Sequence, residues 1–226
     1  MEIALKEVSG SFHPLQMTFT RFLAGGLFLI PFAVRTLKKK KASLIWKDLP
    51  GFLLLGFVGM VLSMSIYQMS VKEVPASVVA VLFSSNPIFT AVLAFFMLKE
   101  PIRRNQIAAL LLEIGGILAI INPFHTSLSP YGVLLAMIST LLFAVYGVMG
   151  KRRCARFGGV VVTCASFLCG GAEMLFMILF SRLPMVNKWL AGSGLELFAN
   201  IPLLSGYSWN TLPWMLMICI VNTGLG

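Results

Sequence analysis

Seven long apolar runs constrain this chain more than any other feature of its sequence. They cover about residues 15–34, 49–69, 75–98, 106–122, 131–150, 159–181 and 209–226. A helix needs ~20 mostly apolar residues to cross the hydrocarbon core of a bilayer, and the runs are close to that length. Only 12% of the residues are charged, roughly half the fraction typical of soluble domains. The runs therefore predict an all-α, polytopic membrane helix bundle whose first partner is the lipid bilayer.

The basic residues lie between the apolar runs and predict the orientation of the chain. Loops 35–47, 99–104 and 151–156 hold 13 of the 18 lysines and arginines, and they alternate with loops that hold few. The positive-inside rule places such loops in the cytoplasm, which predicts a multi-pass protein of the cell membrane. The four lysines at 38–41 also suit anionic lipid, but a role in orientation is the simpler interpretation.

Two short sequence motifs recur in the same order along the chain. FLAGG at 22–26 recurs as FLCGG at 167–171, and LPGFLLLGFVG at 49–59 aligns with LPWMLMICIVN at 212–222. By the orientation above, the first span enters the cytoplasm and its partner, the sixth span, leaves it. This pattern predicts an inverted-topology repeat, the architecture of many secondary transporters. Because parts of each unit have no counterpart in the other, the alignment predicts an internal piece of a longer transporter.

Three segments resemble EamA-type members of the drug/metabolite transporter superfamily. They are residues 16–32, 67–120 and 141–152. The most specific stretch is 76–116, where a small residue follows a short outside loop and a mid-helix proline precedes an inner Lys-Glu pair and a glycine-bearing helix. The resemblance implies two inverted units of five helices, of which about seven of ten are present. It divides the chain into a first repeat at 1–122 without its first helix and a truncated second repeat at 123–226.

The resemblance also implies a function. Members move small metabolites as secondary transporters, commonly exporting amino acids or related compounds, by alternating access around a midplane site at the repeat interface. The partner is then a small-molecule metabolite, and a homodimer is left open. An alternative from another class is a truncated, non-transporting membrane fragment with a structural or interaction role. The substrate, the direction of transport and the coupling ion are not readable from the sequence.

Ionisable residues within the spans are the first candidates for a site, because they are costly in lipid and usually face a cavity or a partner. Arg21, Glu113 and Glu173 qualify. Helical spacing places Ser166 and Glu173 on one narrow polar face of the sixth span, and Ser166 aligns with Arg21 in the repeat. Arg21 suits a substrate carboxylate, or alternatively it snorkels to the interface. Each glutamate either couples transport to protons or makes an interhelical hydrogen bond.

Polar aromatic and amide side chains near the span ends are weaker candidates. Tyr67 and Gln68 lie near the outer end of the second span, and Tyr146 lies within the fifth. Each either contacts substrate or serves as a packing or interface residue. Glu100 ends the third span, and we interpret it as an inner-end anchor that pairs with Arg103 or Arg104.

A polar interruption, Ser84-Ser85-Asn86-Pro87, divides the third span. Pro87 removes a backbone donor and is expected to kink the helix. Small residues recur every three or four positions and predict a face that a neighbouring helix approaches closely; they include Ala76, Ala80, Ser84, Pro87 and Ala91. Asn86 flanks this face and is predicted to reach into a cavity.

The sequence favours no enzyme, cofactor or metal site. The two histidines, His13 and His125, lie in outside segments without metal-ligand spacing. The phosphate-binding pattern GxxxxGK[ST] is absent, and so are nucleic-acid-binding modules.

Overall fold

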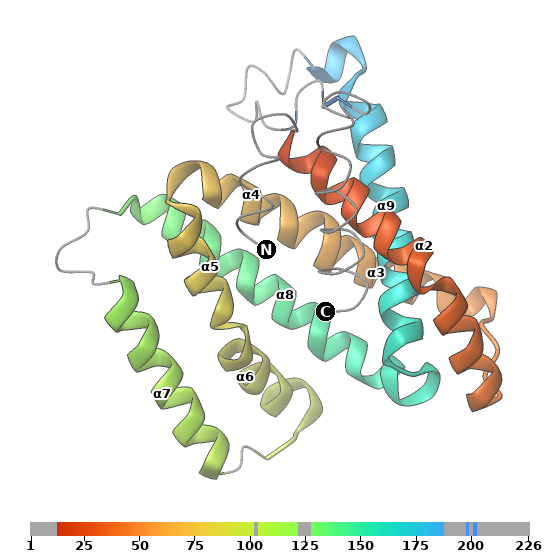
Figure 1. The fold of residues 1–226 in the computed structure, drawn as a ribbon, viewed down its shortest axis with the longest axis horizontal. Helices are drawn as coiled ribbons and strands as arrows, with labels where there is room; N and C mark the ends of the chain where they lie inside the picture. Colours follow the sequence, from red (N-terminus) through yellow and green to blue (C-terminus); the bar gives the residue numbers. More distant parts are fainter. Residues whose placement is uncertain (1–12, 102–103, 122–127, 188–197, 199–200, 203–226) are drawn as a thin grey trace. The chain divides into compact units, whose positions relative to one another are not determined.

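The computed structural model describes residues 13–101, 104–121, 128–187, 198 and 201–202. Within this part of the chain every regular element is helical and no strand occurs, so the all-α prediction is confirmed. Figure 1 shows the helices that the structure describes. The predicted span at 209–226 lies outside the described residues.

Five helical segments are long and apolar enough to cross a membrane. The first is α2 (Pro14–Lys40). The second, Trp46–Glu73, joins η1 (Trp46–Asp48), α3 (Leu49–Gly56), the π-helical η2 (Phe57–Leu62) and α4 (Ser63–Glu73). The third, Ala76–Leu98, joins α5 (Ala76–Ser84) and α6 (Asn86–Leu98). The last two are α8 (Pro130–Phe157) and α9 (Gly159–Ser181). The predicted runs 15–34, 49–69, 75–98, 131–150 and 159–181 are thereby confirmed as helices of spanning length, and α7 (Arg104–Ile121) occupies the run 106–122.

The chain divides into two compact units, each described here by itself. Unit 1 comprises residues 1–61 and 153–226, and unit 2 comprises residues 62–152. Unit 1 therefore contains α2, α3 and α9, and unit 2 contains α4 to α7 and most of α8. These units are not the predicted sequence repeats 1–122 and 123–226, whose boundaries stay a prediction.

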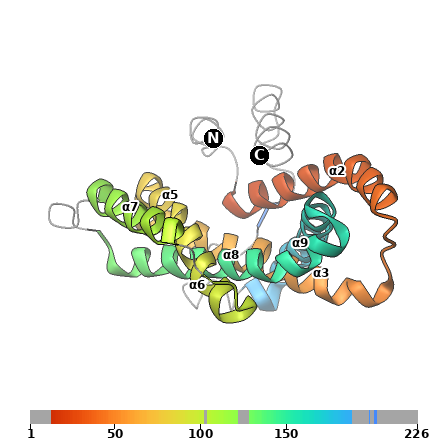
Figure 2. The same cartoon turned by 90° about the horizontal axis from the view of Figure 1, so that it is seen from below.

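In unit 1, α2 packs along α9, and both views show the two helices side by side (Figures 1 and 2). The two copies of the repeated motif, FLAGG and FLCGG, meet at this crossing. The rings of Phe22 and Phe167 lie 5.1 Å apart. A Cβ added to Gly26 would lie 3.0 Å from Leu168, and one added to Gly171 would lie 3.7 Å from Leu23. Because these positions correspond in the alignment, FLAGG and FLCGG contact each other almost reciprocally.

The second helix pair of unit 1, α3 and α9, approaches closely at two glycines. A Cβ added to Gly56 would lie 2.6 Å from the backbone nitrogen of Gly170, and one added to Gly170 would lie 2.6 Å from the Cβ of Met60. Small residues are the usual means of close helix approach in membranes. No larger residue fits at Gly56 without moving a helix backbone.

Unit 2 is held by hydroxyl contacts and a small apolar core. Ser63 Oγ donates to the carbonyl oxygen of Ser139 at 2.9 Å, and Ser139 Oγ donates to that of Ser63 at 2.8 Å. Nearer the other end of α4, Ser70 Oγ donates to the carbonyl oxygen of Gly132 at 2.7 Å. These hydrogen bonds join α4 to α8. The apolar core beside them consists of Val74, Val79, Leu82 and Ala136.

Candidate functional site

The predicted site residues fall in different units. Arg21, Ser166 and Glu173 lie in unit 1, on α2 and α9. The other five lie in unit 2 on α4, α6, α7 and α8, namely Tyr67, Gln68, Asn86, Glu113 and Tyr146. The geometry of each group is therefore given separately.

In unit 1, two polar atoms of α9 are buried without a hydrogen-bond partner in the described part of the chain. They are Ser166 Oγ and Glu173 Oε2. Ser166 is fully buried, whereas the Glu173 side chain is half-buried. Buried polar groups in proteins are nearly always hydrogen-bonded, so each exception calls for an explanation. These atoms are available to a ligand, a water molecule or a proton.

Arg21 lies on α2 and is half-buried. Its guanidinium carbon sits 5.0 Å from the centre of the Phe22 ring, a cation–π distance. The same ring packs on Phe167 of α9. The aromatic pair thus positions Arg21 at the α2–α9 crossing, and its role toward a substrate stays a prediction.

The predicted polar face of α9 also serves helix packing. Gly170 lies between Ser166 and Glu173 on this face, and it approaches Gly56 of α3 and Met60 of η2. The carbonyl oxygen of Ser166 is 3.1 Å from where a Cβ of Gly56 would lie. The middle of the face is therefore a helix contact. A site on α9 would have to use its polar side chains beside that contact.

In unit 2, four aromatic rings from three helices form a continuous row. Ring centres lie 5.2 Å apart between Tyr67 and Phe83, 5.2 Å between Phe83 and Phe143, and 5.4 Å between Phe143 and Tyr146. All four side chains are half-buried. The row brings together Tyr67 and Tyr146, which the sequence proposed separately. Sequence reasoning missed Phe83 and Phe143, although the spacing of Phe143 and Tyr146 marks one helix face.

The helix beside this row is interrupted two residues after Phe83. Helix α5 ends at Ser84 and α6 begins at Asn86, with Pro87 in its first turn. Ser84 Oγ donates to the carbonyl oxygen of Val81 at 2.6 Å, and Ser85 Oγ donates to that of Leu82 at 2.5 Å. The two serine hydroxyls thus donate hydrogen bonds to backbone carbonyl oxygens near the end of α5. Such local bonds are how broken helices are tolerated in membranes.

The small-residue face of this helix is largely uncovered in the described part of the chain. Ala76, Ser84 and Pro87 are exposed, while Ala80 and Ala91 are half-buried. The predicted close approach of a neighbouring helix at this face therefore stays a prediction. Asn86 is half-buried, and its Oδ1 accepts a hydrogen bond from Thr90 Oγ1 at 3.3 Å.

The two remaining candidates of unit 2 lie outside the aromatic row. Glu113 is half-buried on α7, a helix that packs against α5. Gln68 is half-buried and follows Tyr67 on α4. Their assignment to a binding site stays a prediction.

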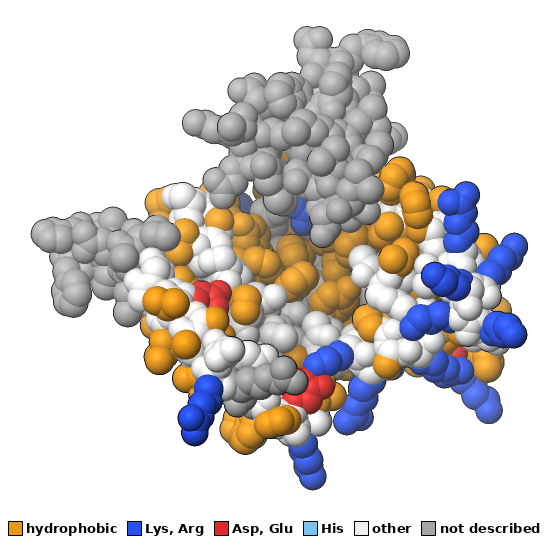
Figure 3. All heavy atoms as spheres, turned by 60° about the horizontal axis from the view of Figure 1, so that its bottom comes forward, with side chains coloured by type: hydrophobic (Ala, Val, Ile, Leu, Met, Phe, Trp, Pro, Cys, Tyr) orange, Lys and Arg blue, Asp and Glu red, His pale blue; other side chains and the backbone are white. Residues whose placement is uncertain are grey.

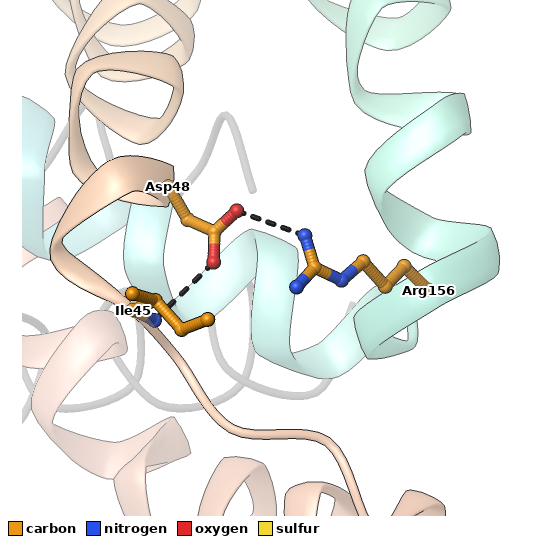
Figure 4. Close-up of polar contacts among 3 residues, drawn as sticks. All are labelled: Ile45, Asp48 and Arg156. Carbon is orange, nitrogen blue, oxygen red and sulfur yellow. Dashed lines mark hydrogen bonds and ion pairs between the residues drawn. The ribbon is translucent and has the colours of Figure 1, made fainter.

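The end of α8 carries contacts that the sequence did not predict. Glu100 was expected to pair with Arg103 or Arg104; Arg103 lies outside the described residues, and in place of Arg104 the partner of Glu100 is Lys151 of α8, so the expected pairing with Arg104 was wrong. Asp48 Oδ1 pairs with Arg156 Nη1 at 3.0 Å, while Asp48 Oδ2 accepts the backbone N–H of Ile45 at 3.2 Å (Figure 4). Both ion pairs join residues more than 50 positions apart, beyond the reach of sequence periodicity.

Comparison with known proteins identifies the family. Residues 2–122 match the model of the EamA-like transporter family. An uncharacterized transporter of Clostridium kluyveri is 32% identical over 184 residues, which are 79% of this chain and 59% of the relative. YedA, an uncharacterized inner membrane transporter of Escherichia coli, is 28% identical over 211 residues, 87% of this chain and 65% of the relative.

A solved crystal structure has a similar fold. It aligns with 96% of this chain and 73% of its own length at a TM-score of 0.59 and 20% sequence identity. The chain spans 59% of the length of the Clostridium kluyveri relative. Since the family model covers more than half of its residues, the chain belongs to the EamA-like transporter family.

Proposed function

We propose that this membrane transporter moves small metabolites, with amino acids and related compounds as the first class to test. It works as a secondary transporter by alternating access around a site near the middle of the membrane. The curated relatives are named transporters without a substrate, so the substrate class is a proposal that starts from what the family resemblance implies and is supported by the side chains described next.

The aromatic row beside the interrupted helix is the observation that carries this proposal. Half-buried rings at 5.2–5.4 Å spacing, tilted or edge-on to one another, offer an apolar aromatic surface to the side chain of a small metabolite. The hydroxyls of Tyr67 and Tyr146 stand at its two ends, and Asn86 follows the break. Irregular backbone at membrane depth is tolerated where it is covered by protein or lines a cavity. The combination suits a ligand with an apolar part and a polar part.

The charged candidates complete the proposal. Arg21 provides a permanent cation for a substrate carboxylate, and Glu113 and Glu173 are candidates for binding the coupling proton. The buried, unpartnered oxygen of Glu173 supports a role in taking up a ligand or a proton.

The orientation of the transporter is also a proposal. We place loops 35–47, 99–104 and 151–156 in the cytoplasm of a cell that carries the protein in its cell membrane. Two observations support a shared side. Lys40 Nζ donates to the carbonyl oxygen of Ala155 at 3.2 Å within unit 1, and Glu100 pairs with Lys151 within unit 2.

Transport by the purified chain in liposomes tests the proposal. A panel of labelled amino acids is offered with and without a pH gradient. Replacing either end of the aromatic row, by Tyr67→Ala or Tyr146→Ala, is expected to reduce uptake about tenfold, because a ring contact contributes up to roughly 1.5 kcal/mol. Tyr131→Phe is the matched control, since Tyr131 is 55% exposed at the start of α8. The absence of flux for every candidate would contradict the proposal.

The proton role is tested separately. Glu173→Gln and Glu113→Gln keep the side-chain shape but cannot bind a proton. If either glutamate couples transport, its variant loses the dependence of uptake on the pH gradient. An unchanged dependence in both variants would remove these residues from the mechanism while leaving the aromatic site in place.

A further inference from the structure

We propose that a basic surface at the end of α2 binds the headgroup of an anionic phospholipid. This anchor patch comprises Lys39, Lys40, Lys41, Leu44, Ile45, Trp46, Lys47 and Arg153. It lies entirely in unit 1 and is separate from the aromatic row. The inference goes beyond the proposed transport function and does not depend on the transported substrate.

The patch has an apolar part that faces outward. Leu44, Ile45 and Trp46 are consecutive and are 49%, 51% and 85% exposed. They lie between α2 and α3, and Trp46 is the first residue of the second spanning segment. Tryptophan is enriched where a membrane meets water, because its ring is apolar and its N–H is polar. A lipid interface accounts for three exposed large apolar side chains at this position.

The cationic part of the patch surrounds this apolar part. Lys39, Lys41 and Lys47 are exposed. Lys41 ends α2 in a left-handed conformation with a φ of 50°, which turns the chain toward the apolar residues. The ammonium group of Lys40 donates to the carbonyl oxygen of Ala155, so the end of α2 is held against the end of α8. Figure 3 shows lysine and arginine side chains gathered at the right of the molecule.

Among the described residues, Asp48 is the acidic residue that borders the patch in sequence, and it does not neutralise the lysines of the patch. The Asp48 carboxylate forms an ion pair with Arg156 and accepts a hydrogen bond from the backbone N–H of Ile45 (Figure 4). Its side chain is only 17% exposed. The lysine charges therefore remain available to an external anion. Juxtamembrane clusters of this kind attract anionic lipids of the inner leaflet.

Arg153 gives the anchor patch a defined binding position for a phosphate group. Its guanidinium lies directly on Gly51, because a Cβ added to Gly51 would be 1.9 Å from Nη2 and 2.5 Å from Cζ. Arg153 is half-buried and has no acceptor among the described residues. A planar guanidinium binds phosphate through two parallel hydrogen bonds. Glycine at 51 is what allows this placement at the first turn of α3.

The neighbouring apolar residues select a lipid over a free phosphate. A soluble anion would need Arg153 and the lysines but would gain nothing from Leu44, Ile45 and Trp46. A phospholipid uses both parts, with its phosphate on the basic groups and its acyl chains on the apolar ones. The patch therefore fits an anionic phospholipid such as phosphatidylglycerol.

Lipid binding to the purified full chain tests the proposal. The chain is held in detergent, so its orientation in a membrane does not enter, and bound lipid is counted by native mass spectrometry. We expect phosphatidylglycerol to bind and to raise the melting temperature. Equal binding of phosphatidylcholine would overturn the proposal, and so would full replacement of the lipid effect by inorganic phosphate.

A charge-removing variant locates the site. In Lys39→Gln/Lys41→Gln/Lys47→Gln we expect the affinity for phosphatidylglycerol to fall about fivefold for each lysine removed. The matched control removes three positive charges from unit 2, including the other left-handed helix end at Lys99; it combines Lys72→Gln, Lys99→Gln and Arg104→Gln. Equal losses in both variants would mean that lipid responds only to net charge, and would overturn the site.

Three further variants test the position of Arg153 and the apolar part of the patch. Gly51→Ala keeps every charge but displaces the Arg153 guanidinium, so it should weaken phosphatidylglycerol binding severalfold; Arg153→Gln tests the same contact if the first variant fails to fold. Trp46→Ala should weaken lipid binding without changing the response to phosphate. Unchanged lipid affinity in both Arg153→Gln and Trp46→Ala would contradict the proposal.

Discussion

Unit 1 and unit 2 hold their helices together in different ways. In unit 1, α9 approaches α3 until a Cβ on Gly56 would lie 2.6 Å from the Gly170 nitrogen. In unit 2, the contacts between α4, α5 and α8 are made by aromatic rings and by serine hydroxyls that donate to carbonyls. Unit 1 also has a ring contact, between Phe22 and Phe167, but it adds a backbone approach at glycine, whereas the contacts of unit 2 named here are made by side chains.

This difference separates a fixed part of the molecule from a part with adjustable contacts. Lipid provides little hydrophobic drive for helix association, so close packing and hydrogen bonds must supply it. A glycine contact has no side chain that can adopt another rotamer, whereas a row of half-buried rings can turn and repack. We infer that unit 1 provides a rigid helix crossing. Unit 2, with the break at Ser85, carries the groups suited to respond to a ligand.

The largest effect is expected where two backbones meet. Gly56→Ala places a methyl group against the Gly170 nitrogen, and a helix must shift to make room. Overpacking of this kind costs about 1–3 kcal/mol, and we expect the upper end because the obstacle is backbone. Thermal unfolding in detergent, followed by circular dichroism, should show a clear fall in melting temperature.

The matched control for Gly56→Ala is Gly147→Ala. A Cβ at Gly147 would meet nothing within 4 Å, and alanine in a helix interior is favoured over glycine by roughly 0.5–1 kcal/mol. This variant should melt at the same temperature as the parent or slightly higher. Equal melting temperatures for the two alanine variants would mean that the α3–α9 approach is not rigid, and the contrast between the units would fail.

A smaller effect is expected in the aromatic row. Phe83→Leu keeps an apolar side chain but removes two ring contacts, with Tyr67 and with Phe143. Ring pairs contribute about 0.5–1.5 kcal/mol each beyond their buried area, so the variant should lose about 1–2 kcal/mol in unfolding measurements. Phe57→Leu is the control, because Phe57 is 48% exposed and has no ring contact among the described residues. Because Phe57 lies in unit 1, this control measures only an ordinary Phe→Leu change. A loss for Phe83→Leu no larger than that for Phe57→Leu would show that the ring contacts of the row add no stability.

The sequence predicts the parts of this molecule that depend on local composition. Apolar length alone locates α2, α8 and α9, because each must satisfy its backbone hydrogen bonds within itself in lipid. The motifs FLAGG and FLCGG predicted a repeat, and the structure places them in contact. Pro87 and its serines marked a break in the third span, which the structure interrupts at Ser85.

Partners distant in sequence could not be predicted in the same way. Periodicity assigns Phe83 and Phe143 to their helices but not to each other, because nothing local encodes which helix lies alongside. Glu100 illustrates the error, since nearby Arg103 and Arg104 were favoured over Lys151, 51 positions away. The functional roles of Arg21, Glu113 and Glu173 depend on a ligand, and they stay predictions.

The serine pair of unit 2 should give a modest and additive effect. Ser63 and Ser139 each donate to the other's backbone carbonyl, so replacing one serine leaves the other bond intact. Interhelical hydrogen bonds in membranes average about 0.6 kcal/mol. Ser63→Ala and Ser139→Ala should each lose about that much, and the double variant about twice as much. The control, Ser77→Ala, removes an exposed hydroxyl. A double variant no less stable than either single one would show that the two bonds act as one unit.

The smallest effects are expected at the ion pairs, which allow the two units to be compared with like chemistry. In unit 1, Asp48 is 17% exposed and accepts two hydrogen bonds, whereas in unit 2 the side chains of Lys151 and Glu100 are 55% and 47% exposed. Exposed pairs contribute about 0–1 kcal/mol and are screened by salt. Asp48→Asn should therefore lower stability measurably, by about 0.5 kcal/mol. Glu100→Gln should change it little, and at high salt not at all. If Glu100→Gln instead has the larger effect, side-chain burial does not determine how much these ion pairs stabilise the protein, and the more stabilising pair is the one in unit 2.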